Sequence, residues 1–93
     1  MKDVYMTIVA SEITTVETLE RKDAYTLQLD GKTYQHKEEI KAMGFEWNGD
    51  FWEKTEVVTT MEAMRDELQS FINTGFITID KMSQVNIYNK YFA

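Results

Sequence analysis

The sequence predicts an α+β fold in which a mostly antiparallel sheet of about five to seven strands carries two main helices. Three observations lead to this prediction. Apolar and polar residues alternate over several short segments, as they do in strands with one buried face. Two segments, at about 36–43 and 60–74, have helical spacing of their apolar residues and are followed by glycine. Two dipeptides, Asp30-Gly31 and Asn48-Gly49, are typical of tight hairpin turns.

We expect a single domain over residues 1–93, because this length fits one hydrophobic core. Hydrophobic residues make up 43% of the chain, which favours a folded globule over a disordered acidic tail. The absence of cysteine excludes disulfides, thiolate metal sites and thiol chemistry. The sequence has neither a signal-peptide pattern nor an apolar segment of membrane-spanning length, so we expect no membrane partner and a cytoplasmic location.

The first third of the chain has the composition of strands. Residues 4–10 are partly apolar on both faces, as in a strand that lies inside a sheet. Residues 15–20 are rich in threonine and suit a second strand better than a helix. Residues 21–23 would form a polar turn into a strand at 24–29. The apolar residues on one face of this last strand are Tyr25, Leu27 and Leu29.

The stretch from Gly31 to Lys54 has the densest start, stop and turn signals. A hairpin turn at Asp30-Gly31 would lead into the short helix, which Gly44 would end in a left-handed conformation. A two-residue turn at Asn48-Gly49 would form a second hairpin. Its expected cross-strand pairs are Trp47 with Asp50, Glu46 with Phe51, and Phe45 with Trp52. In this register both tryptophans point inward, and the outward side chains are Glu46, Phe51 and Glu53.

One pattern in this stretch is shared with a known group of proteins. The residues that carry it are Tyr34, Lys37, Ile40, Lys41, Gly44, Trp47, Trp52 and Lys54. Together they resemble a small module of unassigned function that occurs in phage and mobile-element proteins, often beside primase, helicase or topoisomerase parts. Most of these positions are structural, so the resemblance implies a similar fold more than a given activity. It also implies that a phage or mobile element encodes the chain.

The second half of the chain predicts a longer helix. Residues 55–58 continue the strand that begins at Trp52, and Thr59 and Glu62 have the spacing of a capping box. Gly75 ends the helix. Its apolar stripe consists of Met61, Met64, Leu68, Phe71 and Ile72. A short strand at 76–79 follows.

The C-terminal tail fits two structures. A short helix capped by Asp80 would bring Met82, Val85, Tyr88 and Phe92 to one side. A strand would instead alternate Val85, Ile87 and Tyr91. We favour the helix because Asp80 can cap it.

The net charge of −6 is unevenly distributed. Residues 38–67 contain nine acidic and three basic residues, whereas the remaining residues are balanced. A chain that is acidic in its middle repels phosphate backbones and attracts basic protein surfaces. Direct binding to nucleic acid is therefore disfavoured.

The residues do not form a recognisable catalytic set. His36 is the only histidine, and the four glycines are isolated rather than gathered in a phosphate-binding loop. Adjacent carboxylates such as Glu38 and Glu39 point in different directions on a helix. We therefore expect a binding protein rather than an enzyme, with no catalytic residues, no metal site and no cofactor.

The first functional hypothesis is stoichiometric binding to the basic surface of a nucleic-acid-processing or defence protein. The chain would act as an inhibitor that imitates the charge of nucleic acid. Phe51 would be an aromatic anchor between carboxylates, unless the C-terminal segment covers it. The residues expected to contact this partner are Glu46, Asp50, Phe51, Glu53, Glu62 and Asp66.

The alternative hypothesis is an accessory module that binds single-stranded nucleic acid. Such modules place aromatic side chains beside basic ones on an exposed surface. The residues expected to form this surface are Lys32, Tyr34, His36, Lys37 and Lys41.

Overall fold

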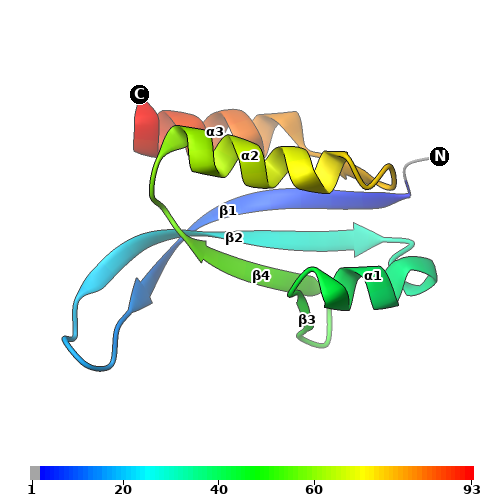
Figure 1. The fold of residues 1–93 in the computed structure, drawn as a ribbon, viewed down its shortest axis with the longest axis horizontal. Helices are drawn as coiled ribbons and strands as arrows, with labels where there is room; N and C mark the ends of the chain where they lie inside the picture. The colour runs from blue at the N-terminus through cyan, green and yellow to red at the C-terminus, as the bar shows by residue number, and fades with distance from the viewer. Residues whose placement is uncertain (1–2) are drawn as a thin grey trace.

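The computed structural model describes residues 3–93 and contains, within that range, one five-stranded sheet and three α-helices (Figure 1). The strands are β1 (Val4–Thr14), β2 (Arg21–Gly31), β3 (Glu46–Trp47), β4 (Trp52–Val57) and β5 (Ile77–Ile79). The helices are α1 (Lys37–Ala42), α2 (Met61–Ile72) and α3 (Lys81–Phe92), and a 3₁₀ turn, η1 (Tyr34–His36), precedes α1. The predicted α+β class is confirmed.

The sheet is antiparallel apart from one pair of strands. Its order is β3-β4-β2-β1-β5, and within residues 3–93 only β1 and β5 run parallel. This arrangement confirms the predicted mostly antiparallel sheet. It also places β1 inside the sheet, as the apolar character of both its faces predicts.

β1 and β2 form one long hairpin, and here the prediction was wrong. The strand pairs run from Val4 opposite Gly31 to Thr14 opposite Arg21, so residues 21–23 belong to a strand rather than a turn. The predicted strand at 15–20 is instead the hairpin loop. In this loop, Thr15 Oγ1 lies 2.7 Å from Thr18 Oγ1, within hydrogen-bond distance. Threonine hydroxyls can make such local bonds in turns, so a threonine-rich segment need not be a strand.

The Asp30-Gly31 dipeptide does not form the predicted hairpin turn. The backbone N–H of Lys32 donates to the carbonyl of Asp3 (3.0 Å), so β2 stays beside β1 until the chain enters η1. Gly31 has a φ of +94°, and a Cβ there would lie 2.5 Å from the Asp3 carbonyl oxygen. Glycine is therefore required for close approach of two strands rather than for chain reversal.

The hydrophobic core lies on one face of the sheet. Its strand residues alternate along β1 and β2, and they are Val4, Met6, Ile8, Tyr25, Leu27 and Leu29. The helices contribute Ile40 from α1, Met64, Leu68 and Phe71 from α2, and Ile87 from α3. The intervening strand residues face the other side of the sheet, which we call the open face. Its members include Tyr5, Val9, Thr26, Gln28, Glu46, Glu53, Thr55 and Val57. Tyr5, the most exposed of its large apolar residues, is 57% exposed.

Two of the predicted helices are confirmed, with one correction at a cap. The segment predicted at 36–43 contains α1, and Gly44 follows it with a φ of +94°. The segment predicted at 60–74 contains α2, whose buried residues lie on the predicted stripe. The N-cap is Thr60 rather than Thr59, because Thr60 Oγ1 accepts the N–H of Ala63 (3.1 Å).

The C-terminal segment is the helix α3, and it is as long as α2, with 12 residues. Asp80 caps it as predicted, since its Oδ2 accepts the N–H of Ser83 (2.9 Å). The predicted apolar side was only partly right, because Met82 and Val85 are exposed. The residues that pack on the core are Ile87, Tyr88, Tyr91 and Phe92.

Removal of the Thr60 hydroxyl should destabilise the fold. We expect Thr60→Ala to lower the free energy of unfolding by about 1 kcal/mol, because the Ala63 N–H loses its acceptor. Thr59→Ala is the matched control and should change stability by less than about 0.5 kcal/mol. Urea unfolding of both variants measures this, and equal losses would contradict the assignment of the cap.

Candidate functional site

The second hairpin has a different register from the predicted one. Trp47 lies opposite Trp52 and Glu46 opposite Glu53, so the pairing is displaced by two residues. The side chain of Asn48 explains this, because its Oδ1 accepts the N–H groups of Asp50 and Phe51, both at 2.9 Å. Asn48 thus begins the turn instead of occupying its centre. A displacement of two residues keeps every side chain on its predicted face.

The new register brings the two tryptophans together but leaves one of them outside the core. The centroids of their rings are 5.5 Å apart, with an interplanar angle of 60°. Trp52 is only 8% exposed, whereas Trp47 is 53% exposed. The prediction that both tryptophans are buried was therefore wrong for Trp47, which presents its ring to solvent at the edge of the sheet.

The segment from η1 to α1 places basic and aromatic side chains opposite this pair. Tyr34 is 80% exposed, and Lys37 Nζ lies 4.8 Å from the centroid of its ring. Lys41 follows one helical turn after Lys37, so both lysines lie on the same side of α1. Among the described residues, no acidic side chain lines the space between this side of α1 and the two tryptophans.

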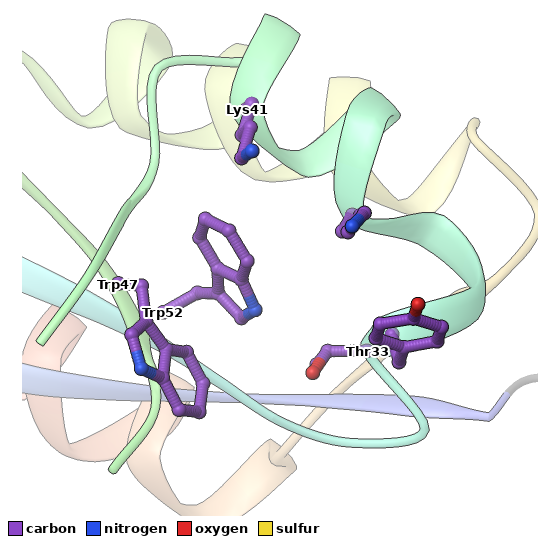
Figure 2. A pocket seen from close by; sticks show the side chains of 6 residues that line it. Thr33, Lys41, Trp47 and Trp52 are labelled. Carbon is purple, nitrogen blue, oxygen red and sulfur yellow. The ribbon is translucent and has the colours of Figure 1, made fainter. Parts of the chain in front are cut away.

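These side chains line an open cavity of about 400 Å³. Its lining residues are Thr33, Tyr34, Lys37, Lys41, Trp47 and Trp52, and we call it the aromatic–lysine cavity. Figure 2 shows the indole rings of Trp47 and Trp52 on one side and Lys41, projecting from α1, on another. An aromatic face and two ammonium groups therefore meet in one open hollow.

The lining of the aromatic–lysine cavity suits a ligand that has both a flat ring and a negative charge. Flat aromatic rings stack on nucleobases of any sequence, and ammonium groups pair with phosphates. Glu38, Glu46 and Glu53 are sequence neighbours of lining residues, but their side chains do not line the cavity. Exposed carboxylates more than about 10 Å away are largely screened at ordinary salt. The local lining therefore decides which small group can enter.

Three of the five residues predicted for nucleic-acid contact line this cavity: Tyr34, Lys37 and Lys41. Lys32 is exposed and does not line it. His36 is occupied elsewhere, because its ring stacks on Phe76 with centroids 4.1 Å apart and its Nδ1 lies 3.3 Å from Glu39 Oε2. Trp47 and Trp52 were not predicted as site residues, because the period-two pattern of the hairpin placed both of them inside.

The six residues predicted for a basic partner do not form one continuous surface. Glu46 and Glu53 lie side by side on the open face, and Asp50 and the half-buried Phe51 belong to the adjoining turn. Glu62 and Asp66 are exposed on α2, which packs on the opposite face of the sheet. The structure thus divides the set into a hairpin group and a helix group.

A polar cluster joins α2 to the covered face of the sheet. Lys54 Nζ lies 3.1 Å from Glu56 Oε1 and 3.5 Å from Glu67 Oε1, and Tyr25 donates its hydroxyl to Glu67 Oε2 (3.4 Å). Burial, together with the charge of Glu56, raises the pKa of Glu67 above its ordinary value of 4.5. Burial and the nearby charge of Glu67 also raise the pKa of Tyr25. The ammonium group of Lys54 is therefore paired with two carboxylates of the chain itself.

Metal ligands, membrane-spanning helices and similarity to known proteins are also signs of function. Within residues 3–93, no three histidine, cysteine, aspartate or glutamate side chains are grouped as metal ligands. No helix in the same range combines the length and apolarity that a membrane crossing requires. No family model, curated protein or solved structure matches the chain. The resemblance of residues 31–54 to the phage and mobile-element module stays a prediction.

Glu67→Gln should make the fold less sensitive to pH. Because the folded-state pKa of Glu67 is raised, its contribution to stability is complete at pH below 4.5 and is lost as pH rises through the folded pKa. Glutamine stays neutral, so the melting temperature of the variant minus that of the wild type should increase between about pH 4 and pH 7. Thermal melts across this range measure it, with the exposed Glu62→Gln as the control. A difference that does not change with pH would contradict the assignment.

Proposed function

We propose that this chain binds single-stranded nucleic acid through the aromatic–lysine cavity, as an accessory module of a nucleic-acid-processing system. The observation that carries this proposal is the meeting of Tyr34 and Trp47 with Lys37 and Lys41 around one hollow. The cavity lies inside the stretch that resembles a module found beside primase, helicase and topoisomerase parts. That resemblance concerns the fold more than an activity, and it is compatible with the proposal.

Each part of the cavity has a role in this proposal. Trp47 offers an exposed ring on which an unpaired base stacks. Trp52 is buried and packs against that ring edge to face. Lys37 and Lys41 contact the phosphates that flank the base. A duplex is a poor ligand because its bases are already stacked and their faces are covered.

The number of phosphate contacts sets the expected affinity and its dependence on salt. Two lysines neutralise about two phosphates, so log K should fall against log salt with a slope of roughly −1.4 for a single strand. This is a shallow dependence, and base stacking supplies much of the affinity. The carboxylates elsewhere on the chain disfavour longer contacts with the phosphate backbone.

A second candidate function is binding to the basic surface of a partner protein. It is favoured by the direct cross-strand pairing of Glu46 with Glu53 on the open face, next to Asp50 in the turn. Like charges opposite each other in a sheet are destabilising, and a cationic partner would relieve the repulsion. In this case the chain would act stoichiometrically, as an inhibitor of a nucleic-acid-processing or defence protein.

Trp47→Ala should weaken oligonucleotide binding and leave the fold intact. Loss of one stacked base corresponds to roughly 5- to 150-fold weaker binding. The melting temperature should hardly change, because Trp47 is 53% exposed. Fluorescence polarisation with a labelled single-stranded oligonucleotide measures the affinity. The same oligonucleotide annealed to its complement tests the selectivity for single strands.

The matched control is Tyr5→Ala, which removes an aromatic side chain of similar exposure from the open face. It should not change the affinity for the oligonucleotide. If both variants bind equally well, or if the wild type shows no binding at low salt, the cavity is not a nucleic-acid site. Glu53→Lys separates the two candidate functions, because it should weaken binding to a basic protein without weakening oligonucleotide binding at the cavity.

A further inference from the structure

β4 is longer than the strand beside it. β3 pairs only with Trp52 and Glu53, whereas β4 continues to Val57 with β2 on its other side. Figure 1 shows β4 running on towards α2 beyond the short β3. The segment 54–57 is therefore an edge of the sheet.

The hydrogen-bond pattern shows which backbone groups face this edge. Val58 donates its N–H to Asp23 in β2 (2.9 Å), and Asn48 donates to the carbonyl of Phe51 (3.1 Å). Along an antiparallel strand, successive residues direct their backbone N–H and C=O groups to opposite sides. Since the backbone of Val58 faces β2, the N–H and C=O groups of Thr55 and Val57 point away from β2. In the described part of the chain, these groups have no backbone partner.

The other side of the sheet is closed where α3 begins. Ser83 Oγ accepts the N–H of Ile8 at 3.1 Å, and Asp80 donates its N–H to the carbonyl of Met6 at 2.8 Å. These bonds continue the pairing of β1 beyond the short β5. A helix therefore covers one edge of the sheet at a place where it would otherwise be free, and nothing in residues 3–93 covers the edge of β4 in the same way.

The free edge of β4 has some of the usual protections of an edge strand, because it is short and its charged residues Lys54 and Glu56 point to the covered face. Two other protections are missing. Proline does not occur in the chain, so it cannot block the edge. Lys54 is the basic residue of the segment, but its ammonium group is directed to Glu56 and Glu67 on the covered side. The edge is left with backbone donors and acceptors that another strand can use.

The side chains around this edge are acidic on the open face. Glu46 and Glu53 border a hollow of about 330 Å³ that Gly44, Lys54 and Thr55 complete. Val57 is 39% exposed and adds a small apolar contact further along. An extended segment added here would place every second side chain beside these groups.

We propose that the edge of β4 at residues 54–57 binds an extended basic segment of a partner protein as an added strand. Backbone hydrogen bonds to Thr55 and Val57 supply the pairing, and lysine or arginine side chains meet Glu46 and Glu53. A second copy of this chain does not fit, because its β4 would bring further carboxylates to the same edge and each copy has a net charge of −6. The inference rests on the second candidate function and is independent of the aromatic–lysine cavity.

The test uses a defined probe, a ten-residue peptide of alternating lysine and threonine. Its control is the same peptide methylated at alternate backbone nitrogens, which keeps the charge but cannot donate to a strand. The unmethylated peptide should slow hydrogen exchange of the Thr55 and Val57 amides by about tenfold or more at saturation, and the control should not.

A variant tests the same edge from the side of the chain. Thr55→Pro removes an N–H that does not pair with β2, so the sheet keeps its backbone hydrogen bonds and loses only the side-chain bond between Thr55 and Thr26. It should weaken peptide binding by about tenfold while oligonucleotide binding is unchanged. Glu53→Lys should also weaken peptide binding, whereas Glu20→Lys in the β1–β2 loop should not. The exchange measurement stands on the unmodified chain if the proline variant fails to fold.

The outcomes distinguish strand addition at β4 from binding to a basic partner by charge alone. Equal binding of both peptides, or binding without protection of the Thr55 and Val57 amides, would overturn strand addition and leave binding by charge alone. Absence of any peptide binding would overturn both strand addition and the basic-partner candidate. Neither result affects oligonucleotide binding at Trp47, which is measured separately.

Discussion

The burial of Ile40 and Phe45 against the core fixes the part of the molecule on which the candidate sites depend. Ile40 is the one buried residue of α1, and Phe45 meets Phe71 of α2 edge to face, with ring centroids 5.5 Å apart. Gly44 stands between them in a left-handed conformation. The short helix is too short to be stable alone, so these two contacts hold its lysines at a set position relative to the second hairpin.

This anchoring explains why one half of the hairpin is buried and the other is not. Phe45 is buried in the core before β3 begins, and Trp52 is buried in the same core at the start of β4. Trp47 lies between them in sequence but at the end of the sheet in space, where β3 is only two residues long. An exposed tryptophan beside two lysines is the result, and it gives the hollow its chemistry.

The acidic character of the chain is a property of separate surfaces rather than of the molecule as a whole. Carboxylates of the hairpin lie on the open face, those of α2 lie on the opposite side, and Glu67 is partly buried with Lys54. Net charge therefore says little about what each surface binds, because solvent screens one from another. A cavity lined by lysines and an edge bordered by glutamates can coexist in a chain of 93 residues.

Local signals in the sequence were sufficient for much of the fold. The alternation of Tyr25, Leu27 and Leu29 and the stripe of α2 are periodic patterns along the chain, and the cap at Asp80 is a contact within a few residues. Each can therefore be recognised without the tertiary structure. The threonines at 15–18 were misinterpreted because the same side chains stabilise strands and turns. Asp30-Gly31 was misinterpreted because glycine permits both reversal and close approach, and only the proximity of Asp3 decides between them.

The candidate site was predictable only in its lysines and Tyr34. By itself the sequence determined that Tyr34, Lys37 and Lys41 lie together, because helical spacing brings them to one side of a short segment. Only the tertiary structure decided that Trp47 joins them and that the edge of β4 is left open. The hairpin register depends on the side-chain hydrogen bonds of Asn48, and the exposure of a strand depends on where its neighbours end, which no local pattern encodes.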